Sequence, residues 1–171
     1  MTGRGSIALL LIAAAILLRP WDLGGAPDPG APRHLSGRVV RAVDGDTLEV
    51  AIDGAGTETV RLIGVDTPET VKPGTPVQCF GPQASHFEHE RVEGRHVRLL
   101  TGVEPRDAYG RLLAYVWVEE GRRRPRFLEA ALLRRGLART LAFRPNDRFA
   151  RRFEELEQKA AQAGKGLWNA C

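Results

Sequence analysis

The chain has 171 residues, of which 43% are hydrophobic and 27% charged, and its formal net charge is +4. These values are ordinary for a globular protein and exclude a wholly disordered chain, while the length allows one domain with a modest core. The charge is unevenly spread, because residues 121–152 hold eleven Arg against Glu129 and Asp147. This basic region suits a polyanionic substrate, although it also fits a solvated helix face.

The N-terminus opens with Arg4 and continues into an apolar run of twelve residues, 7–18. A basic start and a short apolar run are typical of a secretory signal peptide, and a membrane-spanning helix needs ~20 residues. We therefore expect export, with residues 1–19 acting as a signal peptide or, if uncut, as an N-terminal membrane anchor. Residues 20–35 are rich in Gly and Pro and predict a disordered linker, which leaves 36–171 as the folded domain.

Alternating apolar residues predict strands along the first two thirds of the folded domain. Two strands fall within residues 36–53, on either side of a turn at Asp44 and Gly45, a dipeptide that favours a hairpin. The other strands are expected at residues 57–63, 97–100 and 111–119. Between the third and fourth strands, residues 64–79 predict a long loop.

Helices are expected at residues 81–92, 126–135 and 147–163. Pro82 lies near the first turn of the first helix, Gly136 ends the second, and Asp147 is a candidate N-cap for the third. Five strands with about three helices predict an α+β fold, a five-stranded OB-type β-barrel.

Three polar segments lie at the ends of predicted strands. The first is the turn at residues 44–47, the second runs from Arg61 through Asp66 to Glu69, and the third ends in Arg111. A guanidinium can grip phosphate oxygens, one carboxylate can hold a divalent metal, and another can take a proton from water. Each segment alone is a common charged turn, but together they suit chemistry on a phosphate.

With these segments in order, the chain resembles the staphylococcal (micrococcal) thermonuclease family. The resemblance runs from about residue 36 to residue 168, and three motifs in the right order and spacing are a specific signal. The matching residues are Asp44-Gly45-Asp46-Thr47, Arg61-Leu62, Val65-Asp66-Thr67-Pro68-Glu69, Gly81-Pro82, Tyr109-Gly110-Arg111, Gly136-Leu137-Ala138, Pro145-Asn146 and Trp168. The family has the OB-type barrel expected above.

The resemblance implies a calcium-dependent, sequence-nonspecific nuclease that hydrolyses DNA and RNA to products ending in 3′-phosphate and 5′-hydroxyl. It assigns Asp46, Asp66 and the backbone carbonyl of Thr67 to Ca²⁺, an ion that prefers oxygen ligands and retained waters. Asp44 would contact a water molecule bound to that ion.

In the same comparison, Glu69 is the general base, and Arg61 and Arg111 clamp the phosphate oxygens. Tyr109 matches a nucleotide-contacting residue of the family, but Ala108 replaces the Lys often beside it. Phe143 lies where the prototype presents two Tyr, so it could stack on a base but could not offer a phenolic hydrogen bond.

Cys79 and Cys171 are the only cysteines. In an exported chain an even count favours a disulfide, although one buried and one frayed thiol is the alternative. His86 and His89 lie three residues apart on the first predicted helix, and we interpret them as surface residues because no further zinc ligands are apparent.

Two other classes of function stay open at this point. A non-catalytic OB-fold nucleic-acid-binding protein would share the barrel but lack the acids, whereas this chain keeps Asp46, Asp66 and Glu69. An exported structural domain would make the charges incidental. The family resemblance also favours a monomer, with DNA and RNA as partners and membrane contact only through the N-terminal segment.

Overall fold

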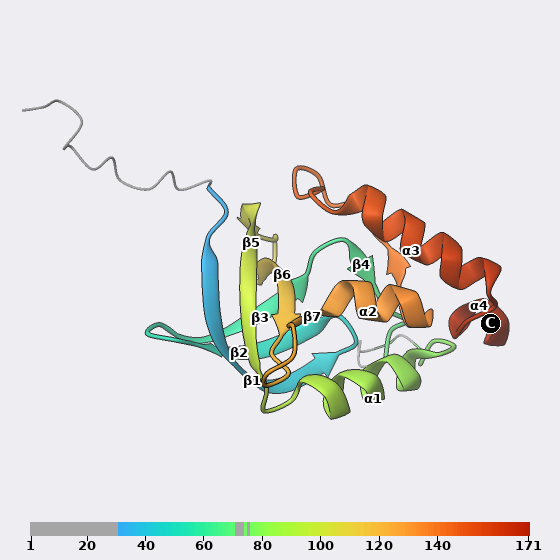
Figure 1. Cartoon of the computed structure of the whole chain (residues 1–171), viewed down its shortest axis with the longest axis horizontal. Coiled ribbons are helices and arrows are strands. Elements are labelled where there is room, and N and C mark those ends of the chain that lie inside the picture. The colour runs from blue at the N-terminus through green and yellow to red at the C-terminus, as the bar shows by residue number, and fades with distance from the viewer. Residues whose placement is uncertain (1–30, 71–73, 75) are drawn as a thin grey trace, which may run out of the picture.

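The computed structural model describes residues 31–70, 74 and 76–171 (Figure 1). The predicted signal segment, residues 1–19, and most of the predicted linker, residues 20–35, lie outside the described residues. The end of that linker is a strand instead, because the first strand begins at His34.

Five strands form a closed barrel, which confirms the predicted OB-type α+β fold. Along the sheet the order is β3, β2, β1, β5, β6, and a parallel pairing of β3 with β6 closes it. The strands are β1 (His34–Asp44), β2 (Thr47–Ile52), β3 (Gly56–Leu62), β5 (His96–Arg106) and β6 (Leu112–Val118).

Strand β1 bends so that it can pair with both neighbours. Its first residues pair with β5, while the pairing with β2 shifts register between Val39 and Arg41 and again between Ala42 and Asp44. Such irregularities increase local bending and are common at barrel rims and beside active sites. Here the second shift lies directly before the turn that carries Asp46.

Three further strands have only two residues each. Strand β4 (Val65–Asp66) pairs with β8 (Arg139–Thr140), and β7 (Arg126–Phe127) pairs with the end of β6. Strand β5 is longer than the predicted residues 97–100. The β4–β8 pair matters most for function, because it ties the loop after β3 to the C-terminal part of the chain.

Among the described residues four helices follow or separate the strands, one more than predicted. They are α1 (Gly81–Val92), α2 (Leu128–Arg135), α3 (Ala150–Gln162) and α4 (Leu167–Ala170). The prediction that residues 126–135 are wholly helical was wrong at its start, which forms β7. The prediction of Asp147 as N-cap was also wrong: Phe149 is the cap, and the Asp147 carbonyl accepts a bond from the Ala150 N–H.

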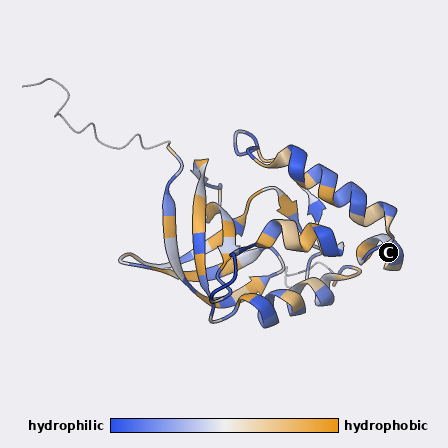
Figure 2. Cartoon of the chain, viewed as in Figure 1, coloured by the Kyte–Doolittle hydropathy of each residue, from blue (hydrophilic) through white to orange (hydrophobic). Residues whose placement is uncertain are grey.

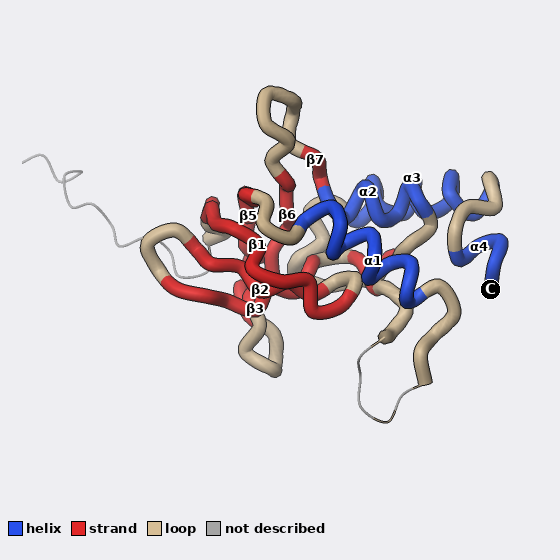
Figure 3. The backbone as a smooth tube through the Cα atoms, turned by 90° about the horizontal axis from the view of Figure 1, so that it is seen from below, coloured by secondary structure: helices blue, strands red, loops and turns tan. Residues whose placement is uncertain are grey.

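The helices gather at one side of the barrel (Figure 3). Helix α2 packs on β6 and α3, and α1 packs on β1. Apolar residues of the strands fill the barrel (Figure 2), and aromatic rings join it to α3, with Tyr115 and Phe149 in edge contact at 4.7 Å. Such rings stabilise a core beyond their buried area.

None of the helices within residues 31–70, 74 and 76–171 is long and apolar enough to cross a bilayer.

Candidate active site

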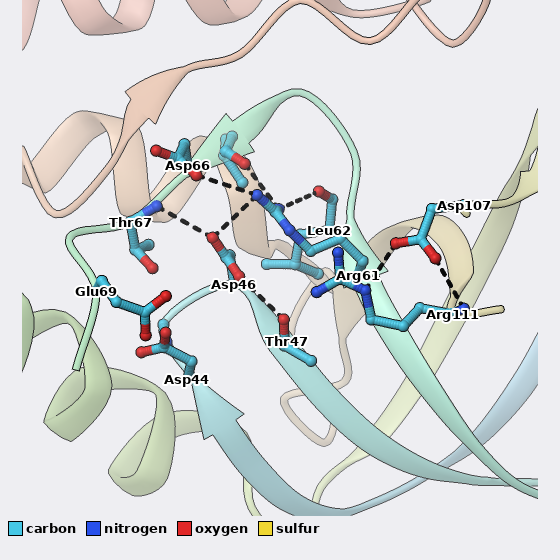
Figure 4. A network of polar contacts seen from close by, with 12 residues as sticks. Asp44, Asp46, Thr47, Arg61, Leu62, Asp66, Thr67, Glu69, Asp107 and Arg111 are labelled. Atoms are coloured by element: carbon cyan, nitrogen blue, oxygen red, sulfur yellow. Dashed lines mark hydrogen bonds and ion pairs between the residues drawn. The ribbon is translucent and has the colours of Figure 1, made fainter. Parts of the chain in front are cut away.

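The centre of the site is the guanidinium of Arg61, a residue that is only 6% exposed. Its Nη1 donates to the carbonyl oxygens of Leu62 and Val65, at 2.7 and 2.8 Å. Its Nη2 lies 3.1 Å from an Asp46 carboxylate oxygen and 3.2 Å from one of Asp66 (Figure 4). A guanidinium held by carbonyls and carboxylates together has a fixed orientation.

The turn between β1 and β2 brings Asp46 to this guanidinium. The Asp46 side chain accepts from the Thr67 N–H at 3.2 Å and from the Thr47 hydroxyl at 3.0 Å. Gly45 lies against Thr67 so closely that an added Cβ would be 2.7 Å from the Thr67 hydroxyl. A glycine is therefore needed between Asp44 and Asp46 for the turn to reach the second loop.

The loop after β4 brings Glu69 to the same place. The Thr70 hydroxyl donates to Asp44 at 2.7 Å, and the Thr70 N–H donates to Glu69 at 3.0 Å. Figure 4 shows the carboxyl groups of Asp44 and Glu69 facing each other. The structure therefore brings Asp44, Asp46, Asp66 and Glu69 together from two loops that are separate in the sequence.

The crowding of these acids changes their titration. Burial raises the pKa of Asp44, and the neighbouring Glu69 raises it further, although bonds from Thr70 and Gly45 partly oppose this. Burial likewise raises the pKa of Asp66, and repulsion from Asp46 adds to the effect while Arg61 opposes it. Repulsion among carboxylates is relieved by a bound cation or by a proton.

Arg111 joins the site from the start of β6. In the parallel pairing of β3 with β6, Arg61 is opposite Leu113, and Arg111 lies two residues before Leu113, just outside the strand. The Arg111 Nε donates to Asp107 at 2.7 Å. Asp107 also accepts from the Tyr109 and Arg111 N–H groups, at 2.9 and 3.0 Å.

Asp107 therefore fixes both the turn and the Arg111 side chain. Partial burial alone would raise the pKa of Asp107, but the bonds from Arg111 and Tyr109 outweigh it and lower the pKa. The sequence contained a signal for this residue, since Asp107 precedes Arg111 by four positions within the third motif, but its role was not predicted.

The two predicted base-contacting residues differ in their surroundings. Tyr109 is 85% exposed, and the Arg111 guanidinium lies 5.4 Å from its ring centre. Phe143 is half-buried against the core and lines a cavity of about 370 Å³ together with Gly64 and Leu141. Tyr109 is thus beside the Arg111 guanidinium, while Phe143 borders a separate cavity.

The oxygen atoms of these acids are suitable ligands for a divalent cation. Carboxylate oxygens of Asp46 and Asp66 lie close to Thr67, whose hydroxyl oxygen is buried without a hydrogen-bond partner among the described residues. Oxygen donors of this kind are what Ca²⁺ prefers. In the described part of the chain, no three acidic, His or Cys side chains are already grouped tightly enough to hold a metal. Here Arg61 is the cation between Asp46 and Asp66.

A disulfide joins Cys79 to Cys171, with sulfur atoms 2.17 Å apart and a sequence separation of 92. It places the C-terminus beside the loop that carries Glu69. His86 and His89 lie on exposed positions of α1, where they face Glu90 and Glu93 at 3.3 and 2.8 Å. These contacts agree with the interpretation of both His as surface residues.

The model of the family described as staphylococcal nuclease homologue matches residues 59–170. The match includes Arg61, Asp66, Glu69 and Arg111 and extends through the C-terminal helices.

Two relatives match nearly the full length of this chain, and a third matches three quarters of it. The chain is 38% identical to a thermonuclease of Staphylococcus intermedius over 165 residues, which is 95% of each protein. It is 36% identical to a thermonuclease of Staphylococcus hyicus over 167 residues, covering 94% of this chain and 95% of the relative. An endonuclease of Bacillus subtilis, YncB, is 39% identical over 131 residues, which is 75% of this chain and 59% of that protein.

Proposed function

The chain belongs to the family of staphylococcal nuclease homologues and hydrolyses phosphodiester bonds, and from this we propose that it cleaves both DNA and RNA. The proposal includes dependence on Ca²⁺, little preference for base sequence, and products that end in 3′-phosphate and 5′-hydroxyl. The observation that carries it is the convergence of Asp46 and Asp66 on the Arg61 guanidinium, with Glu69 beside them.

Two arginines bind and orient the phosphate in this proposal. Arg61 lies in β3, and Arg111 immediately precedes β6, the strand that pairs with β3, so both can reach the oxygens of one phosphate. Negative charge builds on these oxygens as the nucleophile adds, and fixed guanidiniums then interact more strongly than in the ground state. Asp107 keeps Arg111 oriented through the bond to its Nε.

Glu69 is the general base. Its carboxylate takes a proton from a water molecule, and the water oxygen forms a bond to phosphorus as the bond to the 5′ oxygen breaks. The departing 5′ oxygen takes up a proton from solvent, which leaves a 5′-hydroxyl and a 3′-phosphate. Asp44 lies against Glu69 and helps to set its position.

Asp46, Asp66 and the Thr67 carbonyl are the residues that would hold Ca²⁺. When bound, the ion supplies positive charge that stabilises the transition state and lowers the repulsion between the acids. Both carboxylates must be ionised to bind it, so the raised pKa of Asp66 means that affinity falls at acidic pH.

The direct test is digestion of plasmid DNA and of RNA with Ca²⁺ and again with a chelator. We expect both substrates to be cut only with Ca²⁺, and end-group analysis should find 3′-phosphates. Binding without cleavage would instead indicate a nucleic-acid-binding barrel. Cleavage that persists in chelator would contradict the role of calcium.

Replacing Glu69 by Gln tests the general base. Because the amide cannot accept the proton, turnover should fall by roughly 10²-fold or more while the fold is retained. Glu155→Gln, an exposed change on α3, is the matched control and should leave turnover unchanged. Steady-state kinetics measures the turnover, and circular dichroism checks that the fold is retained. A Glu69→Gln variant of near-normal turnover would refute the assignment.

We further propose that the protein is exported and acts as a monomer. Support comes from the apolar run at residues 7–18 and from the disulfide, which suits an oxidising compartment. N-terminal sequencing of protein from its native location would tell whether residues 1–19 are removed. A thiol assay on denatured, unreduced protein should find no free thiol.

A further inference from the structure

We propose that Gln78 is a positioning residue for Glu69 and that the Cys79–Cys171 disulfide holds Gln78 in place. The activity of the enzyme then depends on the oxidised bridge. This inference rests on the proposed role of Glu69 as general base.

The first step is a pair of hydrogen bonds between the two residues. The Glu69 N–H donates to the Gln78 side-chain oxygen at 3.0 Å, and the Gln78 N–H donates to the Glu69 carbonyl at 2.9 Å. Both backbone polar groups of Glu69 are therefore held by one residue. The orientation of this backbone limits where the Glu69 side chain can point, so Gln78 positions the carboxylate together with the Thr70 N–H that bonds to it.

The second step fixes Gln78 itself. Its carbonyl accepts from the Gly81 N–H at 3.0 Å, at the start of α1. The next residue, Cys79, is covalently joined to Cys171. Gln78 is exposed, so burial in the core does not hold it, and these two connections provide its support.

The third step anchors Cys171 to the core. Cys171 ends α4, and the first residue of that helix, Leu167, donates its N–H to the Gly136 carbonyl at 2.9 Å. Contact here is so close that a Cβ on Gly166 would lie 2.3 Å from the same carbonyl oxygen. Gly136 ends α2, whose residues Leu128 to Leu133 are buried.

These contacts form a continuous connection from a core helix to the general base. It runs from α2 through α4 and the disulfide to Gln78 and then to Glu69. The bridge also closes a long loop and so stabilises the fold by restricting the unfolded chain. Stability and positioning must therefore be measured separately, at a temperature where every variant is fully folded.

The test compares Gln78→Met, Gln78→Glu and a bridge-free protein with Cys79→Ser and Cys171→Ser. Methionine keeps the length of the side chain but loses the acceptor, whereas glutamate keeps an oxygen acceptor. We expect kcat to fall about 10-fold in Gln78→Met and in the bridge-free protein, with KM changed less than about 2-fold, since misplacement affects the chemical step. Gln78→Glu should recover most of the loss.

Two further measurements separate this inference from the proposed function. Reductant should lower the kcat of the native protein and leave the bridge-free protein unchanged. Hydrogen exchange at the Glu69 amide should quicken at least 10-fold in Gln78→Met and in the bridge-free protein, because its acceptor is lost or released. Native kcat and unchanged Glu69 exchange in both variants would overturn the inference. If the native protein cleaves nothing, the proposed function fails, while Glu69 exchange still decides whether Gln78 positions that residue.

Discussion

Glu88 is fully buried on the face of α1 that also carries Ala84 and Val92, and neither carboxylate oxygen has a hydrogen-bond partner among the described residues. Burial raises the pKa of Glu88 well above its usual range, and repulsion from Asp46, Glu129 and Asp44 raises it further, while Arg61 opposes these effects. A buried carboxyl of this kind keeps its proton at neutral pH. The folded protein is therefore expected to hold Glu88 as a neutral acid.

The stability of the fold should then depend on pH through Glu88. Below the ordinary glutamate pKa of about 4.3 the group is protonated in both states and has no pH-dependent effect. Above it the unfolded chain releases the proton that the folded chain keeps, so the free energy of unfolding decreases as pH rises. Glu88→Met should remove this dependence and stabilise the protein by about 1–3 kcal/mol at pH 8, and by less at pH 5.

Glu129 provides the contrast for that measurement. It is equally buried, and burial also raises its pKa, but its carboxyl accepts from the Val116 N–H at 3.0 Å. Glu129→Met leaves that N–H without its acceptor, so it should stabilise less than Glu88→Met or destabilise. Urea unfolding at both pH values measures these effects. A Glu88→Met protein that is less stable than the native one at pH 8 would contradict this account.

At the scale of elements, the junction of α2 and α4 is a backbone contact that only glycine permits. Gly136 has φ 65°, and a Cβ there would lie 2.1 Å from the Lys165 carbonyl oxygen. Gly164 has a similar φ of 56°, but the nearest atom to an added Cβ is 3.9 Å away. The two positions therefore have similar backbone conformations and differ in the room available for an added Cβ.

This pair gives a matched prediction. Gly164→Ala should cost only the strain of a left-handed residue, about 1 kcal/mol. Gly136→Ala should cost at least twice as much, because the chain from Lys165 onward must move. Thermal unfolding of both variants measures the difference. Equal losses would mean that the contact with Lys165 adds nothing to stability.

The sequence predicted the elements with strong periodicity and missed those that depend on tertiary contacts. The five barrel strands and the apolar stripe of α2 carry patterns that burial requires, so their places were found. Strands β4, β7 and β8 have two residues each and carry no period, and α4 exists through its contact with Gly136. Asp147 has the chemistry of an N-cap, but the turn after Pro145 starts the helix two residues later.

The same distinction applies to the site. The acids and both arginines were found because they lie in motifs whose order is specific. Gln78 and Thr70 act through bonds to Glu69 and Asp44 across the fold, and nothing in their sequence neighbourhood signals this. The engagement of Arg61 with Asp46 and Asp66 was likewise visible only in three dimensions.

At the scale of the whole molecule, the charge is separated between an acidic site and arginine-rich surroundings. On the helical side, burial lowers the pKa of Arg135, and repulsion from Arg126, Arg91 and Arg134 lowers it further. These arginines are on α1, β7 and α2, whereas the acids of the site lie at the end of β1, in the turn before β2, in β4 and just after β4. Long-range attraction by the arginines can thus bring a polyanion to the protein. The acids of the site repel that polyanion, so they require a bound cation between them and it.

Calcium should consequently stabilise the folded protein even without substrate. Binding to the folded state alone raises the free energy of unfolding by about 2.7 kcal/mol when the free ion is at a hundred times its dissociation constant. Thermal unfolding should show a Tm that increases with Ca²⁺ and returns to its metal-free value when chelator is added. Asp46→Asn should lose most of this increase, and Asp53→Asn, at the far end of β2, should keep it. A Tm insensitive to Ca²⁺ would argue against the ion.

The most direct measurement is a crystal structure of the protein soaked with Ca²⁺ and a nucleoside 3′,5′-bisphosphate. The account predicts a single Ca²⁺ bonded to Asp46, Asp66 and the Thr67 carbonyl, identified by anomalous scattering. It also predicts that Arg61 and Arg111 contact one phosphate and that Glu69 faces the same group. A cation bound elsewhere, or a phosphate that touches neither arginine, would contradict it.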